Sequence, residues 1–142
     1  MGLIQGNDAF NNRDMKNLLN AAKAAMQKAY APYSNYSVGA AVLGVSGEVY
    51  SGCNVENAAY PLGNCAETSA IAAMIAGGES EIAEVFIMTK GAKPGTPCGG
   101  CRQRLAEFAG ADVLVHCALE TGEVNTHTMG ELLPHAFDLK EQ

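Results

Sequence analysis

The fold can be worked out from two short stretches, CAE at positions 65–67 and PCGGC at positions 97–101. Each stretch follows a turn-rich loop and opens a helix-like run. Residues two apart in mid-helix point to opposite sides, so Cys65 and Glu67 can reach one centre only at a helix N-terminus. Cys98 and Cys101 are three apart and share a helix face. The spacing therefore predicts two helices whose first turns meet at a common centre.

Three cysteines and one carboxylate at such a centre suit a catalytic zinc ion. Structural zinc sites fill all four tetrahedral positions from the protein, whereas catalytic sites keep three protein ligands and one open position. A Cys-x-x-Cys pair alone is also typical of structural zinc ribbons and redox motifs. The upstream Cys-Ala-Glu and the proline before Cys98 favour the zinc deaminase pattern, in which a glutamate that is not a ligand is the general acid/base.

The composition predicts a single domain over residues 1–142, with residues 1–11 as a flexible tail. Charged residues are 17% and hydrophobic residues 48% of the chain, which favours a compact fold with subunit interfaces. The formal charge of −6 has the wrong sign for a nucleic-acid-binding protein. No apolar stretch approaches about 18 residues and the start lacks an export signal, so we expect a cytoplasmic protein without a membrane segment.

The five cysteines are an odd number in a chain without an export signal, which argues against a disulfide framework. Three of them are assigned to zinc. Cys53 and Cys117 each lie in an apolar strand-like run, and we expect both to be buried, inert thiols.

Apolar periodicity and turn residues predict the order of the elements. A helix is expected from about Asn12, its N-cap, to Ala29, because apolar residues recur at helical spacing and Pro32 stops the helix. The further elements are expected as strands 38–45 and 48–54, helix 65–76, strand 82–89, helix 98–109, strands 113–117 and 123–128, and a short helix holding Leu132 and Leu133. A tight turn joins the last two strands, so they must be antiparallel.

Asn54 and Glu56 form a second candidate site at the end of a predicted strand. They lie two apart and point to one side if the strand geometry persists. An amide and a carboxylate just before the zinc segment are suited to a hydroxyl-rich ligand. A solvated strand end is the alternative interpretation.

Taken together, these residues resemble the small homotetrameric cytidine deaminases of pyrimidine salvage. The resemblance runs from about residue 30 to residue 137, through YAPYS at 30–34, VGAA at 38–41, GCNVENAAY at 52–60, CAE at 65–67, PCGGCRQ at 97–103 and ELLP at 131–134. The family implies a three-layer α/β/α fold with a mixed five-stranded sheet, in agreement with the predicted elements. It also implies a homotetramer whose subunits complete each other's active sites.

The resemblance implies a chemical role for each residue of the zinc segment. Cys65, Cys98 and Cys101 would bind one zinc ion per subunit. Glu67 would shuttle protons, and the backbone of Ala66 would contact the base of the substrate.

It also implies a set of contacts to the nucleoside. Asn54 and Glu56 would hold the ribose 3′-hydroxyl. Ala58 and Tyr60 would reach the site from a neighbouring subunit, and Phe137 would cover the base from another. Packing of a C-terminal element in the core is the alternative role for Phe137.

Two positions depart from the family pattern. Tyr36 stands where many relatives carry Phe against the nucleoside, which keeps the ring but adds a hydroxyl that needs a partner. Thr68 stands where many carry Arg beside the thiolates. Zinc with three thiolates has a net charge of −1, so we expect Arg102 and the two helix N-termini to supply the missing positive charge.

The expected activity is zinc-dependent hydrolytic deamination of cytidine and 2′-deoxycytidine to uridine and 2′-deoxyuridine. A deaminase of the same fold that acts on modified cytosine nucleosides or blasticidin S is the alternative enzyme. A non-catalytic zinc-stabilised protein would need a fourth protein ligand, for which the chain offers His116, His127 and His135. A nucleic-acid deaminase is disfavoured by the acidic charge and the antiparallel final hairpin.

Overall fold

The structure is a computed structural model that describes residues 5–139, with side chains from residue 13 onward. Among these residues, five strands form one mixed sheet in the order β2-β1-β3-β4-β5. The strands are β1 (Gly39–Gly44), β2 (Val49–Cys53), β3 (Ile82–Thr89), β4 (Leu114–Leu119) and β5 (Val124–Thr128). The helices are α1 (Gln5–Met26), α2 (Ala66–Ala76), α3 (Gly99–Phe108) and α4 (Met129–Leu132), with a 3-10 turn at Tyr60–Leu62.

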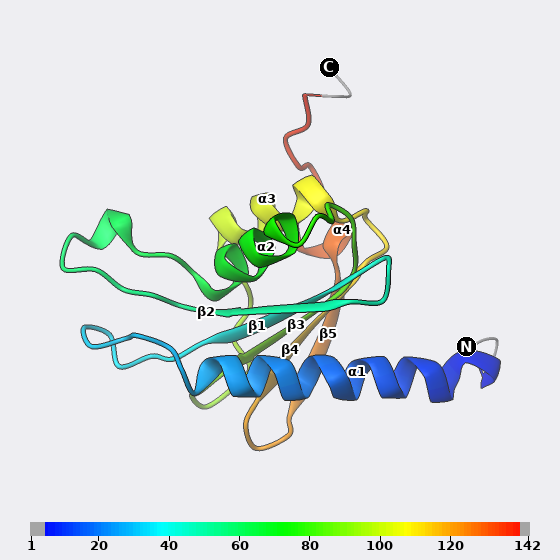
Figure 1. Ribbon diagram of the computed structural model, residues 1–142, viewed down its shortest axis with the longest axis horizontal. Helices are drawn as coiled ribbons and strands as arrows, with labels where there is room; N and C mark the ends of the chain where they lie inside the picture. Colours follow the sequence, from blue (N-terminus) through cyan, green and yellow to red (C-terminus); the bar gives the residue numbers. More distant parts are fainter. Residues whose placement is uncertain (1–4, 140–142) are drawn as a thin grey trace.

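The sheet lies between two layers of helix. Helix α1 runs along one face, and α2 and α3 cover the other (Figure 1). Strand β1 is antiparallel to both β2 and β3, β3 and β4 are parallel, and β4 and β5 are antiparallel. The predicted three-layer α/β/α fold and the antiparallel final hairpin are confirmed.

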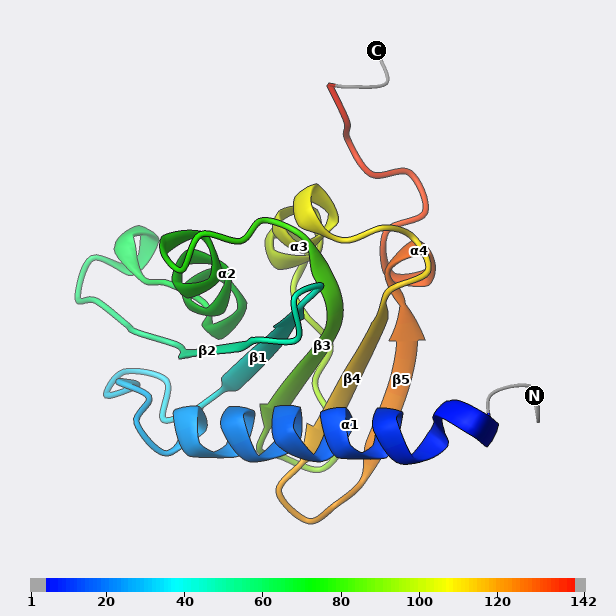
Figure 2. The same ribbon diagram turned by 45° about the vertical axis from the view of Figure 1, so that its right-hand side comes forward.

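Each face of the sheet has its own apolar core, because successive strand residues point to opposite faces. On the α1 face, Leu18 and Ala22 of the helix pack against Phe86 and Ala118 of the central strands. The larger core fills the α2 and α3 face. Turning the molecule shows α1 crossing the whole sheet beneath the strands (Figure 2).

Two glycines let the helices approach the β1–β2 hairpin closely. A Cβ added at Gly39 would lie 1.9 Å from the carbonyl oxygen of Ala22 in α1, and one at Gly52 would lie 2.5 Å from the backbone nitrogen of Ala70 in α2. Neither helix could keep its position if these residues had side chains. Gly52 therefore sets how closely α2 packs against β2, and Cys65 lies at the N-terminus of α2.

The expected helix 12–29 is present, but its predicted ends are wrong. It begins at Gln5, so Asn12 lies inside it rather than at its N-cap and residues 5–11 are helical rather than a tail. No proline or glycine lies between positions 7 and 12, and each added helical residue gains a hydrogen bond. The prediction for residues 1–4 falls outside the described residues.

The helix also ends earlier than predicted, at Met26, well before Pro32. The Tyr30 N–H donates to the Asn54 carbonyl (3.0 Å), and the Glu56 N–H donates to the Tyr30 carbonyl (2.9 Å). These bonds draw the chain into a bridge beside β2. The long-range pairing thus overrides the helical pattern. The other predicted elements are found within a few residues of their expected limits, although Leu133 lies just beyond α4.

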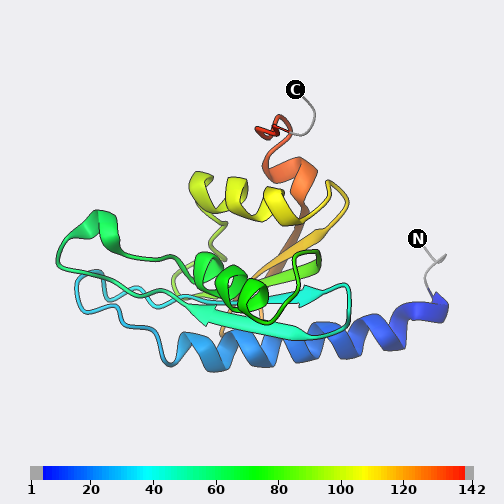
Figure 3. The ribbon, with the colours of Figure 1, turned by 45° about the horizontal axis from the view of Figure 1, so that its top comes forward.

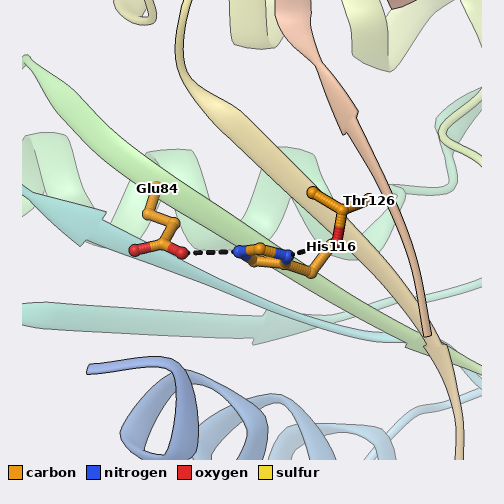
Figure 4. A network of polar contacts seen from close by, with 3 residues as sticks. All are labelled: Glu84, His116 and Thr126. Atoms are coloured by element: carbon orange, nitrogen blue, oxygen red, sulfur yellow. Dashed lines mark hydrogen bonds and ion pairs between the residues drawn. The ribbon is translucent and has the colours of Figure 1, made fainter. Parts of the chain in front are cut away.

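A polar network joins three strands on the α1 face. His116 on β4 contacts Glu84 of β3 through Nε2 (2.5 Å) and Thr126 of β5 through Nδ1 (2.8 Å) (Figure 4). The imidazole also packs against Phe86, with ring centroids 5.8 Å apart. Both ring nitrogens thus have partners in a largely apolar layer, as buried polar groups require.

Replacing Gly52 should displace α2 and weaken the centre built on its N-terminus. We expect Gly52→Ala to lower the free energy of unfolding by about 1–3 kcal/mol, the usual cost of overpacking, and to lower the zinc content of the purified protein. Denaturant unfolding and metal analysis measure the two effects. Gly110→Ala is the matched control, because a Cβ there meets nothing within 4 Å. Equal stability of the two variants would contradict the packing role of Gly52.

Candidate active site

Three cysteine sulfurs meet where two helices begin. Cys65 is the N-cap of α2, Cys98 is the N-cap of α3, and Cys101 lies in the first turn of α3. The three Sγ atoms all lie within 4.8 Å of one another. Tetrahedral zinc with sulfur ligands at about 2.3 Å needs sulfurs about 3.8 Å apart, so small side-chain rotations suffice for a shared ion.

The donor set fits zinc chemically. Burial raises the pKa values of the Cys65 and Cys101 thiols, whereas a hydrogen bond from the Cys101 N–H lowers the pKa of Cys98. Zinc binds thiolates and releases their protons, so metal binding and deprotonation are coupled here. The positive ends of α2 and α3 point at the sulfurs and favour their charged form.

Glu67 lies beside this cluster in the first turn of α2. Its side chain is buried, with 5% of the residue exposed. Burial raises the pKa of Glu67, opposed by its own backbone N–H, by Cys101 and by the charge of Arg104. A carboxyl group with a raised pKa is suited to taking up and giving back a proton near neutral pH.

Arg102 makes hydrogen bonds that the sequence did not predict. Its guanidinium donates to the carbonyls of Pro97 (2.7 Å) and Leu132 (3.0 Å) and to the Thr96 hydroxyl (3.1 Å). It therefore joins the loop before α3 to the end of α4, and within residues 13–139 its hydrogen bonds go to oxygen atoms. The effect of the Arg102 charge on the thiolates stays a prediction.

Thr68 and Arg104 also act on this centre, Thr68 through a contact and Arg104 through its charge on Glu67. The Thr68 hydroxyl is 4.0 Å from the Cys101 sulfur, a hydrogen-bond distance for sulfur. Arg104 folds back over the first turn of α3, where a Cβ added at Gly100 would lie 3.3 Å from its Nη1 atom. The hydroxyl thus contacts one sulfur of the cluster, and the guanidinium lies over the helix turn that carries this cysteine.

A cavity of about 270 Å³ opens over Cys65, Cys98 and Glu67. Four predicted substrate-binding residues also line it, namely Tyr36, Asn54, Glu56 and Ala66. Five further lining residues were not predicted, namely Ser34, Val38, Ile87, Thr89 and Thr96. Ser34 and Val38 belong to quoted motifs, and Thr96 directly precedes the PCGGC stretch. Ile87 and Thr89 carry no local signal, because only the sheet brings them to the cavity.

Asn54 and Glu56 are both bonded to the tyrosine-rich segment 33–38. Asn54 accepts from the Val38 N–H (2.9 Å) and donates to the Tyr36 carbonyl (2.8 Å). Glu56 accepts from the backbone N–H groups of Tyr33 (3.0 Å) and Ser34 (3.1 Å). The two side chains predicted to bind sugar thus also hold one wall of the cavity.

A second cavity of about 350 Å³ adjoins the first, since Ser34 and Glu56 line both. Tyr33 and Tyr60 meet there edge to face, with ring centroids 6.1 Å apart. Segments 30–38 and 54–64, which carry these rings, project together beyond the same end of the sheet (Figure 3). The cavities therefore form one site at the base of two projecting loops.

Three predicted contacts lie outside the cavity over Glu67. Ala58 and Tyr60 are exposed on the projecting loop, and Tyr60 is 76% exposed. Phe137 is 63% exposed, while the Gln103 side chain bonds its backbone N–H (3.2 Å) and carbonyl (2.9 Å). The alternative role of Phe137 was packing in the core of its own chain. Its exposure is inconsistent with that role.

The histidines of the described residues do not join the zinc cluster, whose members there are the three cysteines. His116 lies on the α1 face of the sheet, bonded to Glu84 and Thr126. Because residues 13–139 place no fourth ligand in this cluster, its geometry matches a catalytic rather than a structural zinc site. The other two cysteines are free thiols. Cys117 is buried, which raises its pKa to about 11, whereas Cys53 is only half-buried, contrary to expectation.

Comparison with known proteins decides the family. A family model described as the zinc-binding region of cytidine and deoxycytidylate deaminases matches residues 12–117. The chain belongs to this deaminase family. The match and the three-cysteine cluster together support the zinc cofactor expected from the sequence.

Individual deaminases match over most of the chain. The cytidine deaminase of Sporosarcina psychrophila is 37% identical over 128 residues, covering 90% of this chain and 94% of that protein. The cytidine deaminase of Halalkalibacterium halodurans is 38% identical, covering 90% and 97%. The crystal structure of cytidine deaminase from Burkholderia pseudomallei superposes with a TM-score of 0.82 at 44% identity, covering 86% of this chain and 98% of that chain.

The contacts of Arg102 predict a structural effect of its removal. Arg102→Ala leaves two carbonyls without their donor, so we expect the metal-free protein to lose about 1–3 kcal/mol of unfolding free energy. Lys93→Ala is the control, because Lys93 is exposed in the loop before α3, and it should change stability by less than about 0.5 kcal/mol. Denaturant unfolding with and without zinc makes the measurement. A loss confined to zinc-loaded Arg102→Ala would instead support the role predicted from sequence.

Proposed function

We propose that the protein catalyses the zinc-dependent hydrolytic deamination of cytidine and 2′-deoxycytidine to uridine and 2′-deoxyuridine, with release of ammonia, in pyrimidine salvage. The observation that carries the proposal is a cluster of three cysteine sulfurs, two of whose residues line one cavity together with the buried Glu67. Hydroxyl-binding groups line the same cavity. The cytidine deaminase relatives support the reaction and the substrate base.

Cys65, Cys98 and Cys101 would hold the zinc, and Glu67 would move the protons. Zinc, when bound, supplies a Lewis acid that lowers the pKa of a water molecule. Glu67 takes a proton from the attacking water and delivers it to N3 of the cytosine ring, which makes C4 electrophilic. After the water oxygen has added to C4, Glu67 takes the remaining proton from the new C4 hydroxyl and passes it to the departing amino group, which leaves a carbonyl at C4. One water is consumed and one ammonia is released, and the carboxylate is restored.

The sugar would be recognised by the hydrogen-bonding capacity that Asn54 and Glu56 have left. The Asn54 amide nitrogen has two hydrogens, of which one is donated to the Tyr36 carbonyl. The Glu56 carboxylate has about four acceptor positions, of which three are used. A ribose 3′-hydroxyl could accept from Asn54 and donate to Glu56 at once. The Ala66 backbone and the Tyr36 ring would contact the base.

The charge of the site favours a nucleoside over a nucleotide. The titratable lining residues of the two cavities are Glu56, Glu67, two cysteines and three tyrosines, with no Lys or Arg among the described residues there. Burial of a phosphate without a cation is costly. The formal charge of −6 likewise supports a small substrate rather than a nucleic acid.

Self-association is the second part of the proposal. After its first turn, helix α2 is apolar on all sides, and its exposed outer residues Ala72, Ala73, Ile75 and Ala76 carry no charge. A helix of this kind is usually buried on every side. We therefore expect a homotetramer in which Ala58, Tyr60 and Phe137 enter the sites of neighbouring subunits.

No helix within residues 5–139 is long and apolar enough to cross a membrane. The cytoplasmic location expected from the sequence stays a prediction.

Glu67→Gln tests the proposed reaction. Because the amide keeps the shape but cannot shuttle a proton, we expect the variant to bind about one zinc per chain yet lose about 10²- to 10⁴-fold in kcat. Loss of cytosine absorbance reports turnover of cytidine, 2′-deoxycytidine and cytidine 5′-monophosphate, and the monophosphate should be the poorest substrate. Glu107→Gln, on the exposed side of α3, is the control. Near-normal turnover by Glu67→Gln would contradict its role, and turnover of blasticidin S alone would favour the alternative substrate.

Mixing two inactive variants tests the shared sites. Glu67→Gln removes the proton shuttle, whereas Tyr60→Ala removes a contact that we expect to act in a neighbouring subunit. When the two variants are unfolded and refolded together, mixed tetramers should contain some sites with both residues intact. Recovered activity and a tetramer in sedimentation are the expected results. A fully active wild-type monomer would exclude the proposed assembly.

A further inference from the structure

The side chain of Ser34 forms a hydrogen bond to Glu56. The Ser34 hydroxyl donates to Glu56 Oε2, while Oε1 accepts the backbone N–H groups of Tyr33 (3.0 Å) and Ser34 (3.1 Å). The carboxylate is thus held at both oxygens by two consecutive residues. These bonds, led by that from the Ser34 hydroxyl, keep the pKa of Glu56 below its usual value, so the group is an anionic acceptor at neutral pH.

The same hydroxyl also shapes the cavity wall. Its oxygen accepts the N–H of Tyr36 (3.0 Å), which brings the chain back over Ser34. Asn35, between them, has φ of 57°, in the left-handed region that asparagine tolerates better than most residues. Ser34 therefore connects the carboxylate of Glu56 to the segment that carries the Tyr36 ring.

The carboxylate of Glu56 has one acceptor position left for a substrate, and its hydrogen bonds show on which oxygen this position lies. With both Oε1 contacts made and one of the Oε2 positions taken by Ser34, the open acceptor position is on Oε2. Ser34 and Glu56 line both cavities of the site. A free Glu56 side chain could rotate among several rotamers, whereas the serine holds the oxygen that a substrate hydroxyl would meet.

We propose that Ser34 is a positioning residue for sugar recognition, whose hydroxyl holds Glu56 Oε2 in the orientation that accepts the 3′-hydroxyl of the nucleoside. The inference rests on the proposed function and adds to it a residue that acts through another. If Ser34 only stabilised the loop, its removal would impair every nucleoside alike. If it acts through Glu56, the effect of removal should depend on the 3′-hydroxyl.

The test compares cytidine with 3′-deoxycytidine as substrates of the wild type and of Ser34→Ala. A hydrogen bond to a charged group is worth about a tenfold change, so Ser34→Ala should lower kcat/KM for cytidine by about tenfold, mainly through KM. For 3′-deoxycytidine the two proteins should agree within about twofold. Ser34→Thr keeps the hydroxyl at an exposed position and should retain most of the wild-type discrimination.

The chain offers a matched control at a distance from the cavity. Ser46, in the turn between β1 and β2, donates through Oγ to Glu79 (2.7 Å) and through its N–H to the same carboxylate (2.8 Å). Ser46→Ala removes the same kind of contact and should leave kcat/KM unchanged for both nucleosides.

The outcomes separate this inference from the proposed function. Equal losses for both nucleosides in Ser34→Ala, or no loss for either, would overturn the positioning role while leaving the deamination intact. Absence of cytidine turnover by the wild type would overturn the proposed function and the inference with it.

Discussion

The close approach of three cysteine sulfurs at two helix N-termini is the constraint on which the rest of the structure depends. Thiolates this near to one another repel, and a buried Glu67 beside them adds to the repulsion. Two helix dipoles, the Thr68 hydroxyl and the charge of Arg104 oppose this repulsion. A bound zinc ion would neutralise most of the remaining negative charge. Metal binding would therefore also stabilise the packing of α2 against α3.

The scaffold holds those two helix starts from several directions. Gly52 allows α2 to lie directly on β2, and the Val55–Asn64 bridge ties the segment before Cys65 to the end of the same strand. Arg102 connects the loop before α3 to the end of α4 through backbone carbonyls. Arg102, next to the zinc ligand Cys101, thus binds backbone carbonyls, because a planar guanidinium can donate to several carbonyls at once.

The end of the cavity proposed to bind the sugar is held by hydrogen bonds from side chains to the backbone. Asn54 and Glu56 lie just beyond the end of β2, where the backbone hydrogen bonds of the sheet stop. Their side chains form hydrogen bonds to the backbone of segment 33–38 instead. Groups that already have protein partners lose little freedom when a ligand uses their remaining capacity. The polar wall is therefore formed before the substrate arrives, while Tyr60 and Phe137 are largely exposed.

The sequence by itself determined the elements and the metal-binding residues, because these depend on short spacings. Two cysteines before helix-forming runs and one cysteine a turn later can face a common point, and apolar periodicity locates strands and helices without knowledge of the fold. The antiparallel final hairpin followed in the same way from a tight turn. Asn54 and Glu56 were identified from their spacing of two.

Only the tertiary structure decided which groups meet across long separations in the chain. Helix α1 ends at Met26 because Tyr30 pairs with residues 54–56, which no local pattern contains. The partners of Arg102, the bond between Ser34 and Glu56, and the presence of Ile87 and Thr89 in the cavity depend on contacts between distant segments. Such contacts depend on how the sheet aligns its strands and helices, whereas helix and strand patterns depend on neighbours a few residues apart.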